Sequence, residues 1–172
     1  MKFFIFPVLL FSIACFTACN YTHHIYIVRH AEKSAEPPAD PHLNIEGKVR
    51  AEILKGLLKE KNIKAIYSTE KLRSVETATP LSRLTNVSIQ YYGNDSLPAF
   101  LQEVIRHNKN ALIVGHSNTC VTMISSLNLG HSITFIPDNG YDNLFIIKIR
   151  HGKAIKLTET KYGATSPPVK KG

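Results

Sequence analysis

The feature that most constrains the fold is a short, unbroken apolar run that ends in an arginine–histidine pair. Residues 24–28 are β-branched or aromatic almost throughout, without polar alternation, a pattern typical of a strand buried on both faces of a sheet. Further strands are predicted at 63–67, 87–91 and 111–114. Strands of this kind need helices on both sides, so the pattern favours a layered α/β architecture.

Helices are predicted between these strands. In the first, apolar residues recur at helical spacing: Ile45, Val49, Ile53 or Leu54, Leu57 and Leu58. The predicted N-caps are Ser68 or Thr69 for the second helix, and Ser117 or Asn118 for the fourth. The first helix is predicted to begin at about Asn44 and the third at Ser96, with Pro98 in its first turn. Residues 133–136 are a short strand or a loop, and 144–150 and 154–160 flank a hairpin-like break at His151-Gly152. The predicted fold is an α/β three-layer sandwich with a mostly parallel central sheet and an antiparallel C-terminal edge.

Length and charge indicate one domain that does not bind nucleic acid. A chain of 172 residues with 44% hydrophobic residues can build one full core. The formal charge is +8, but no run of Lys or Arg exceeds two residues. A nucleic-acid binder would show a basic stripe with interleaved aromatic residues, whereas a thin basic excess suits an enzyme with anionic substrates.

The N-terminal segment carries the features of an export signal. Met1-Lys2 precedes a nearly continuous apolar stretch over 3–16 that is too short to span a bilayer comfortably. Small residues then precede Cys19, as in a bacterial lipobox, and we expect a lipid on this cysteine and an exported, periplasmic or cell-envelope protein. An ordinary cleaved signal peptide is the alternative. The predicted divisions are a signal peptide at 1–18, a domain at 20–165 and a loose basic tail at 166–172.

Two arginines and two histidines follow predicted strands. Arg29 and His30 end the first strand, Arg73 lies one turn into the helix after the second, and His116 follows the fourth. Ligand sites of open parallel sheets form beyond the carboxyl ends of the strands, so these four side chains are expected to converge.

These residue types suit phosphoryl chemistry. Arginine forks hold phosphate oxygens bidentately, and a neutral imidazole nitrogen can attack phosphorus to give a covalent phosphohistidine. A second imidazole can stabilise the charge of the transition state. The positive charge comes from side chains, so neither a metal nor a cofactor is predicted.

Four segments of the chain occur in a recognisable order: Arg29-His30-Ala31-Glu32, Leu43-Asn44-Ile45-Glu46-Gly47, Ser68 through Arg73 with Glu76-Thr77-Ala78, and Gly115-His116-Ser117-Asn118. Together they resemble the signature of the histidine phosphatase superfamily, in its phosphoglycerate mutase-like branch. The resemblance implies a small single-domain member in which His30 is the phosphorylated nucleophile. It assigns Arg29, Arg73 and His116 to the phosphate pocket, and a phosphorylated small molecule or phosphoprotein as substrate.

The chain departs from the family pattern in places. Asn44 stands where Thr or Ser is usual, and Glu76 where Gln is common. Many members carry a proton-donating carboxylate after the third strand, and here only Asp95, or Glu103 further along, is available. Members without that acid favour leaving groups that need little protonation, such as protein phosphohistidine.

Other polar residues have two alternative places in the prediction. Asp142 and Asn143 resemble a run that small family members place near the pocket, and a position elsewhere is the alternative. Glu32 positions Arg73 or a substrate, or is simply solvated. The predicted function is a phosphatase acting on phosphomonoesters or protein phosphohistidine through His30. A non-catalytic phosphate-binding lipoprotein and a phosphoglycerate mutase-type phosphotransferase are the alternatives.

Overall fold

The computed structural model describes residues 22–167. Its elements follow the order β1 (Thr22–Arg29), α1 (Ile45–Leu58), β2 (Ala65–Ser68), α2 (Leu72–Thr85), β3 (Ile89–Tyr91), α3 (Leu97–Arg106), β4 (Ala111–Gly115), α4 (Ser117–Ser125), β5 (Asn143–Arg150) and β6 (Lys153–Lys161). Residues 133–136 contain no strand. The predicted signal peptide and Cys19 lie outside the described residues.

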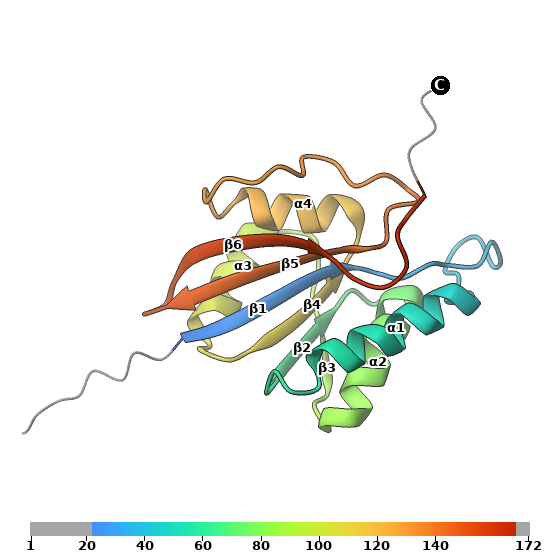
Figure 1. Ribbon diagram of the computed structural model, residues 1–172, viewed down its shortest axis with the longest axis horizontal. Coiled ribbons are helices and arrows are strands. Elements are labelled where there is room, and N and C mark those ends of the chain that lie inside the picture. The colour runs from blue at the N-terminus through green and yellow to red at the C-terminus, as the bar shows by residue number, and fades with distance from the viewer. Residues whose placement is uncertain (1–21, 168–172) are drawn as a thin grey trace, which may run out of the picture.

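The strands form one sheet in the order β3-β2-β4-β1-β5-β6 (Figure 1). The pairs β1–β4, β2–β4 and β2–β3 are parallel, whereas β5 pairs antiparallel with β1, and β6 with β5. The predicted sheet, parallel in its centre with an antiparallel C-terminal edge, is therefore confirmed. Parallel pairing of β1, β2 and β4 brings their carboxyl ends to one edge, which hereafter is the catalytic edge.

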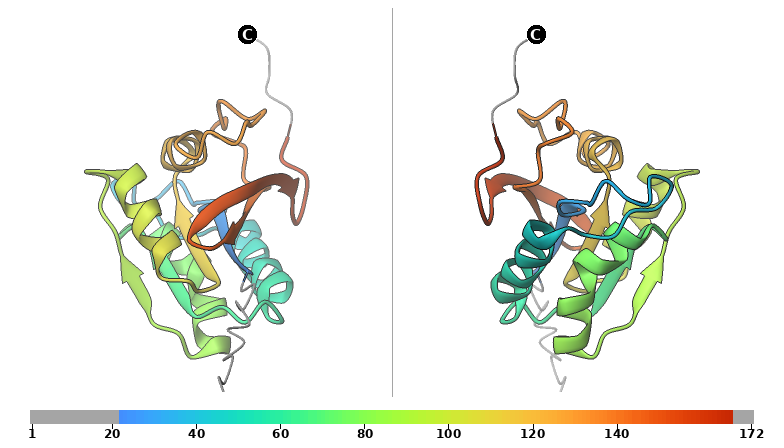
Figure 2. Two further views of the ribbon diagram at one scale, coloured as in Figure 1. Left: turned by 90° about the vertical axis from the view of Figure 1, so that its left-hand side faces the viewer. Right: turned by 90° about the vertical axis from the view of Figure 1, so that its right-hand side faces the viewer.

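Helices cover both faces of the sheet (Figure 2). Leu101 of α3 and Met123 of α4 join a core with one face of the central strands, and Leu54 of α1 and Leu81 of α2 join a second core on the opposite face. Fully buried β1 residues such as Ile27 and Val28 point to opposite cores. This is the three-layer arrangement that the unbroken apolar runs predict.

Two predicted helix caps are wrong. The N-cap of α2 is Lys71, not Ser68 or Thr69, because those hydroxyls are engaged elsewhere: Ser68 Oγ donates to Thr69 O, and Thr69 Oγ1 bonds to His116. The N-cap of α4 is His116, not Ser117 or Asn118. Its backbone N–H donates to Thr119 Oγ1 at 2.7 Å, so the hydroxyl that closes this turn lies inside the helix.

The apolar residues of α1 separate into a buried and an exposed set. Leu54 and Leu58 are buried in the second core. Ile45, Val49 and Leu57 are exposed by 77%, 54% and 45% of their surfaces, and Ile53 is exposed as well. These four residues are spaced by four and so share one ridge of the helix. An apolar stripe usually faces the core, so this exposed ridge is unusual.

The close approach of α1 to the chain after β1 depends on Gly47. A Cβ atom at this position would lie 2.1 Å from Glu32 O and 3.0 Å from Glu32 N, and this neighbour is backbone that cannot rotate away. We expect Gly47→Ala to lower the free energy of unfolding by about 3 kcal/mol, as measured by urea denaturation.

The same helix offers a matched control. A Cβ on Gly56 would meet nothing within 4 Å, so Gly56→Ala is expected to be neutral or to stabilise by about 0.5–1 kcal/mol through helix propensity. Equal effects of the two substitutions would contradict a steric role for Gly47.

The described chain after β6 makes hydrogen bonds to the loop before β5. Ser166 N donates to Asp142 Oδ2 at 3.1 Å, and Asn139 Nδ2 donates to Pro167 O at 3.1 Å. Ser166 and Pro167, the described residues of the predicted tail 166–172, therefore have backbone groups that hydrogen-bond to the loop before β5. No helix within 22–167 has the length and apolar character needed to cross a membrane.

Candidate active site

The four predicted site residues come together at the catalytic edge. Arg29 is the last residue of β1, His30 follows it, His116 follows β4, and Arg73 lies in the first turn of α2. The rings of His30 and His116 are 5.4 Å apart and nearly perpendicular. Arg29 and His30 are buried, and the charge of Arg73 acts on both histidines.

The backbone fixes the His30 ring. Its Nδ1 lies 2.8 Å from Ala31 O, and because a carbonyl only accepts, Nδ1 carries the proton. The unprotonated nitrogen is then Nε2. His30 N also donates to Gly115 O at 2.8 Å, and Ala31 N donates to Thr77 Oγ1 at 2.9 Å. The strand end that carries His30 is thus tied to β4 and to α2.

Both histidines are neutral at physiological pH. Burial, followed by the positive charges of Arg29 and Arg73, lowers the pKa of His30 to about 3. Burial and the same arginines lower the pKa of His116 to about 4. A neutral imidazole retains the lone pair that a nucleophile needs, so burial, together with the two arginines, keeps His30 in its reactive form.

The arginines retain unpartnered N–H groups. Arg29 Nη1 donates to Pro137 O at 2.6 Å and to Gly140 O at 3.2 Å, and Arg73 Nη1 lies 3.6 Å from Asp40 Oδ1. The Nε atoms of Arg29 and Arg73 are buried and have no hydrogen-bond partner within the described part of the chain. Buried donors are rarely left unsatisfied, so each of these N–H groups is a candidate donor to a bound oxyanion.

Thr69 lies beside the second histidine. Its Oγ1 is 3.2 Å from His116 Nε2, and it is buried in the turn between β2 and α2. Sequence reasoning assigned Thr69 to a helix cap. The structure instead places its hydroxyl where it orients His116.

Tyr141 is a site residue that sequence reasoning missed. Its ring lies 6.0 Å from the His30 ring, and the guanidinium carbon of Arg29 lies 4.5 Å from its centroid. No motif marks it, and only its place next to Asp142-Asn143 gave a signal. Those two residues are turned elsewhere: Lys161 Nζ donates to Asp142 Oδ1 and to Asn143 Oδ1. Of the segment Tyr141-Asp142-Asn143, the residue that lies beside His30 and Arg29 is therefore Tyr141.

Glu32 has a structural partner that was not predicted. Arg50 Nη2 donates to Glu32 Oε1 at 2.7 Å and Arg50 Nε lies within 3.0 Å of both carboxylate oxygens. Arg50 is buried and also donates to Tyr162 O and Ala164 O. Glu32 therefore joins the loop after β1 to the C-terminal segment. It neither contacts Arg73 nor stands free in solvent.

The two departures from the family pattern are accommodated locally. Asn44 is the N-cap of α1, and its Oδ1 accepts from Gly47 N at 2.8 Å, as a threonine hydroxyl would. Glu76 Oε2 accepts from Leu43 N at 2.7 Å, and its other oxygen pairs with His42. Both residues hold the loop that leads into α1.

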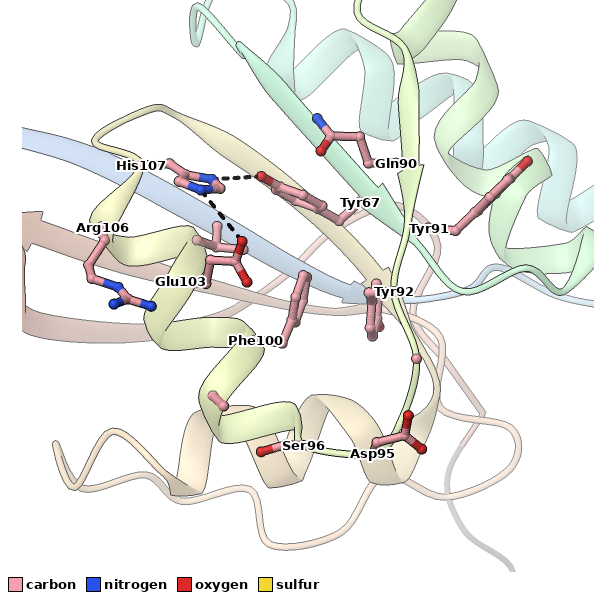
Figure 3. A pocket seen from close by; sticks show the side chains of 13 residues that line it. Tyr67, Gln90, Tyr91, Tyr92, Asp95, Ser96, Phe100, Glu103, Arg106 and His107 are labelled. Atoms are coloured by element: carbon pink, nitrogen blue, oxygen red, sulfur yellow. Dashed lines mark hydrogen bonds and ion pairs between the residues drawn. The ribbon is translucent and has the colours of Figure 1, made fainter.

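The two candidate proton donors lie at different ends of a pocket between β3 and α3 (Figure 3). Glu103 points to His107, 3.8 Å away, and His107 Nδ1 bonds to Tyr67. Asp95 is exposed in the loop after β3, at the catalytic edge. Of the two carboxylates, Asp95 is the one on the side of the sheet that carries His30.

The donor set does not suggest a metal centre. No group of three or more His, Cys, Asp or Glu side chains within residues 22–167 is arranged to hold a metal ion. Cys120 is the one cysteine within residues 22–167. Its side chain is buried in α4, as expected for a cysteine that packs as a small apolar side chain.

Fold and site together define an α/β protein whose candidate site suits an oxyanion. Residues 25–93 match the histidine phosphatase superfamily (branch 1). The matched range contains the first three of the four motifs that resemble this superfamily. No curated protein matches the chain by sequence.

Solved structures share the fold. The protein histidine phosphatase SixA complexed with tungstate has a TM-score of 0.65 and 15% identity, over 83% of this chain and 96% of that one. A SixA protein from Agrobacterium tumefaciens has a TM-score of 0.59 and 19% identity, over 79% and 97%. Mycobacterial glucosyl-3-phosphoglycerate phosphatase has a TM-score of 0.59 and 11% identity, over 84% and 100%. At these identities, the comparisons establish a common fold.

The neutral state of His30 makes stability depend on pH. An unfolded histidine titrates near pH 6.5, whereas burial holds the pKa of folded His30 at about 3. The folded state favours the neutral form of His30 over the protonated form, and this contribution to the free energy of unfolding is fully present above pH 6.5. It is lost as the pH falls toward 3, because the unfolded chain takes up a proton that folded His30 does not. Between pH 6.5 and 5 the free energy of unfolding should fall by about 2 kcal/mol through His30. Urea denaturation at both pH values measures this difference.

A variant without the titrating ring isolates that contribution. His30→Gln protein should lose about 2 kcal/mol less than wild type over the same pH interval, while His151→Gln, at an exposed hairpin position, should behave as wild type. An equal decrease in the free energy of unfolding between pH 6.5 and 5 in all three proteins would show that His30 is not held neutral by the fold.

Proposed function

We propose that this protein is a phosphatase that hydrolyses phosphomonoesters or protein phosphohistidine through a phosphohistidine intermediate on His30. One observation carries the proposal. The free Nε2 of a neutral, backbone-oriented His30 lies in a cluster with two arginines whose buried Nε–H groups lack partners within the described residues. A nucleophile and an oxyanion site are thereby combined.

In the first step, His30 Nε2 attacks phosphorus and an N–P bond forms as the bond to the leaving group breaks. Arg29 and Arg73 hold the oxygens of the phosphoryl group and offset their charge. His116, oriented by Thr69, faces the same group from the end of β4. In the second step, water attacks phosphorus, the N–P bond breaks, and phosphate leaves with His30 restored.

Protonation of the leaving group sets the range of substrates. Asp95 is exposed at the catalytic edge, but no hydrogen bond joins it to either histidine in the described structure. A weakly assisted leaving group must be stable as an anion or leave as a neutral imidazole. This supports aryl phosphates and protein phosphohistidine over alkyl phosphates. The structural relative named as a protein histidine phosphatase supports protein phosphohistidine as a substrate, and the relative named as a glucosyl-3-phosphoglycerate phosphatase supports phosphomonoesters as a class.

The arginines also support a reaction that needs no metal, because they supply the positive charge at the phosphoryl group. We propose further that residues 1–18 direct export and that Cys19 carries a lipid, on the sequence pattern alone. Mass spectrometry of the protein from its native membranes tests this, since a lipidated N-terminus adds the mass of its acyl chains to a chain that begins at Cys19.

The test of the catalytic proposal is turnover of p-nitrophenyl phosphate by the purified protein in buffer containing a chelator. We expect release of p-nitrophenol together with a phosphoenzyme, trapped by rapid quenching, that is stable in base and labile in acid. Peptide mapping should locate the phosphoryl group on His30. A phosphoenzyme at another residue, or activity that disappears with the chelator, would contradict the proposed mechanism.

A further inference from the structure

A groove beside the catalytic edge runs between the exposed ridge of α1 and the chain after β6. It encloses about 460 Å³, a volume suited to a small organic group. Ile45, Val49 and Ile53 form one wall, and Ala164, Thr165 and Pro167 form the other. The exposed apolar residues of α1 thus have a defined place in the molecule.

The charges of the groove favour an uncharged ligand over an anion. Arg50 is its only cationic lining residue in the described structure, and its donors are engaged by Glu32, Tyr162 O and Ala164 O. Glu32 is neutralised by this pair, which leaves the carboxylate of Glu46 exposed at the rim. An apolar wall with a free carboxylate and no free cation favours an uncharged apolar group over a second anion.

The groove is continuous with the candidate site through Tyr141. This ring lines the groove and also lies 6.0 Å from the His30 ring and over the Arg29 guanidinium. Glu32, another lining residue, is two positions after His30. A group attached to a phosphoryl group at His30 therefore reaches the groove by passing along Tyr141.

We propose that this groove is a leaving-group subsite that selects phosphomonoesters with an apolar, uncharged leaving group of about naphthyl size. The inference rests on the proposed phosphatase activity and adds the substrate class to it. Tyr141, Ile45 and Val49 determine specificity by contact with the leaving group.

Three aryl phosphates of similar leaving-group acidity test the subsite. For wild type, kcat/KM should be about tenfold higher for 2-naphthyl phosphate than for phenyl phosphate, because the second ring buries further apolar surface. The value for 4-carboxyphenyl phosphate should lie below that for phenyl phosphate, because its carboxylate meets Glu46. Equal values for the three compounds would overturn the proposal.

Surface variants of α1 locate the effect. The double variant Ile45→Ser/Val49→Ser should reduce the advantage of 2-naphthyl over phenyl phosphate to less than twofold. Leu57→Ser is the matched control, since Leu57 lies on the same exposed ridge but does not line the groove, and it should retain the tenfold advantage. An unchanged advantage in the double variant, or an equal loss in Leu57→Ser, would place the selectivity elsewhere.

A binding measurement separates failure of the subsite from failure of the catalytic proposal. If wild type turns over none of the three compounds, the proposed phosphomonoesterase activity fails, and naphthalene fluorescence then reports binding of 2-naphthyl phosphate directly. The subsite predicts a Kd about tenfold weaker in the double variant and unchanged in Leu57→Ser. Equal Kd values in all proteins would overturn the subsite as well.

Discussion

His30→Ala protein should hydrolyse p-nitrophenyl phosphate more slowly than wild type by a factor on the order of 10⁴ or more. The substitution removes the Nε2 that the Ala31 carbonyl holds unprotonated, so no covalent intermediate can form. The remaining arginines can still bind phosphate, and the inhibition constant for phosphate should change little. Steady-state kinetics and rapid-quench trapping measure the two effects.

An exposed histidine provides the control for that result. His151 lies in the β5–β6 hairpin and is exposed, so His151→Ala should have wild-type kinetics. A His30→Ala protein that keeps a tenth or more of wild-type activity would show that another residue is the nucleophile.

Arg73→Ala should reduce kcat/KM by about 10³-fold, which is the scale expected when a preorganised donor to the transition state is lost. Its Nε, like that of Arg29, is buried and has no hydrogen-bond partner among residues 22–167, and its charge adds to the burial that lowers the pKa of His116 and of His30. Arg73→Lys restores the charge without the bidentate fork and should recover only part of the loss. Thermal denaturation should show folded protein in each case.

Asp40→Asn separates the role of the arginine from that of its partner. Asp40 lies 3.6 Å from Arg73 Nη1 and its side chain is partly exposed, and an ion pair of this kind contributes little to stability. We expect less than a fivefold change in kcat/KM for Asp40→Asn. Wild-type rates in Arg73→Ala protein would remove Arg73 from the phosphate pocket.

The sequence was most informative where a pattern has a single structural solution. An unbroken apolar run such as 24–28 is stable only between two helical layers, so the layered fold could be predicted. Parallel strands place their carboxyl ends at one edge, and for that reason Arg29, Arg73 and His116 could be brought together without coordinates.

What could not be predicted depends on tertiary partners. Tyr141 reaches His30 from a loop without periodicity, and the pairing of Glu32 with Arg50 joins segments whose approach is set by Gly47. The predicted cap at Thr69 was wrong for the same reason, because its hydroxyl bonds to His116 from a distant part of the chain. Ser68 instead donates locally, to Thr69 O. The exposed ridge of α1 shows that helical periodicity alone does not identify the core face.

If Cys19 carries a lipid, the direction of β1 determines how the domain is oriented relative to the membrane. β1 starts at Thr22, only three positions after Cys19, and ends at Arg29 next to the nucleophile (Figure 1). Eight extended residues span about 25 Å. A lipid on Cys19 would tether the domain by the edge opposite the catalytic one. The pocket would then open toward the aqueous compartment, beyond reach of phosphate groups in the anchoring bilayer, and would serve substrates that arrive by diffusion.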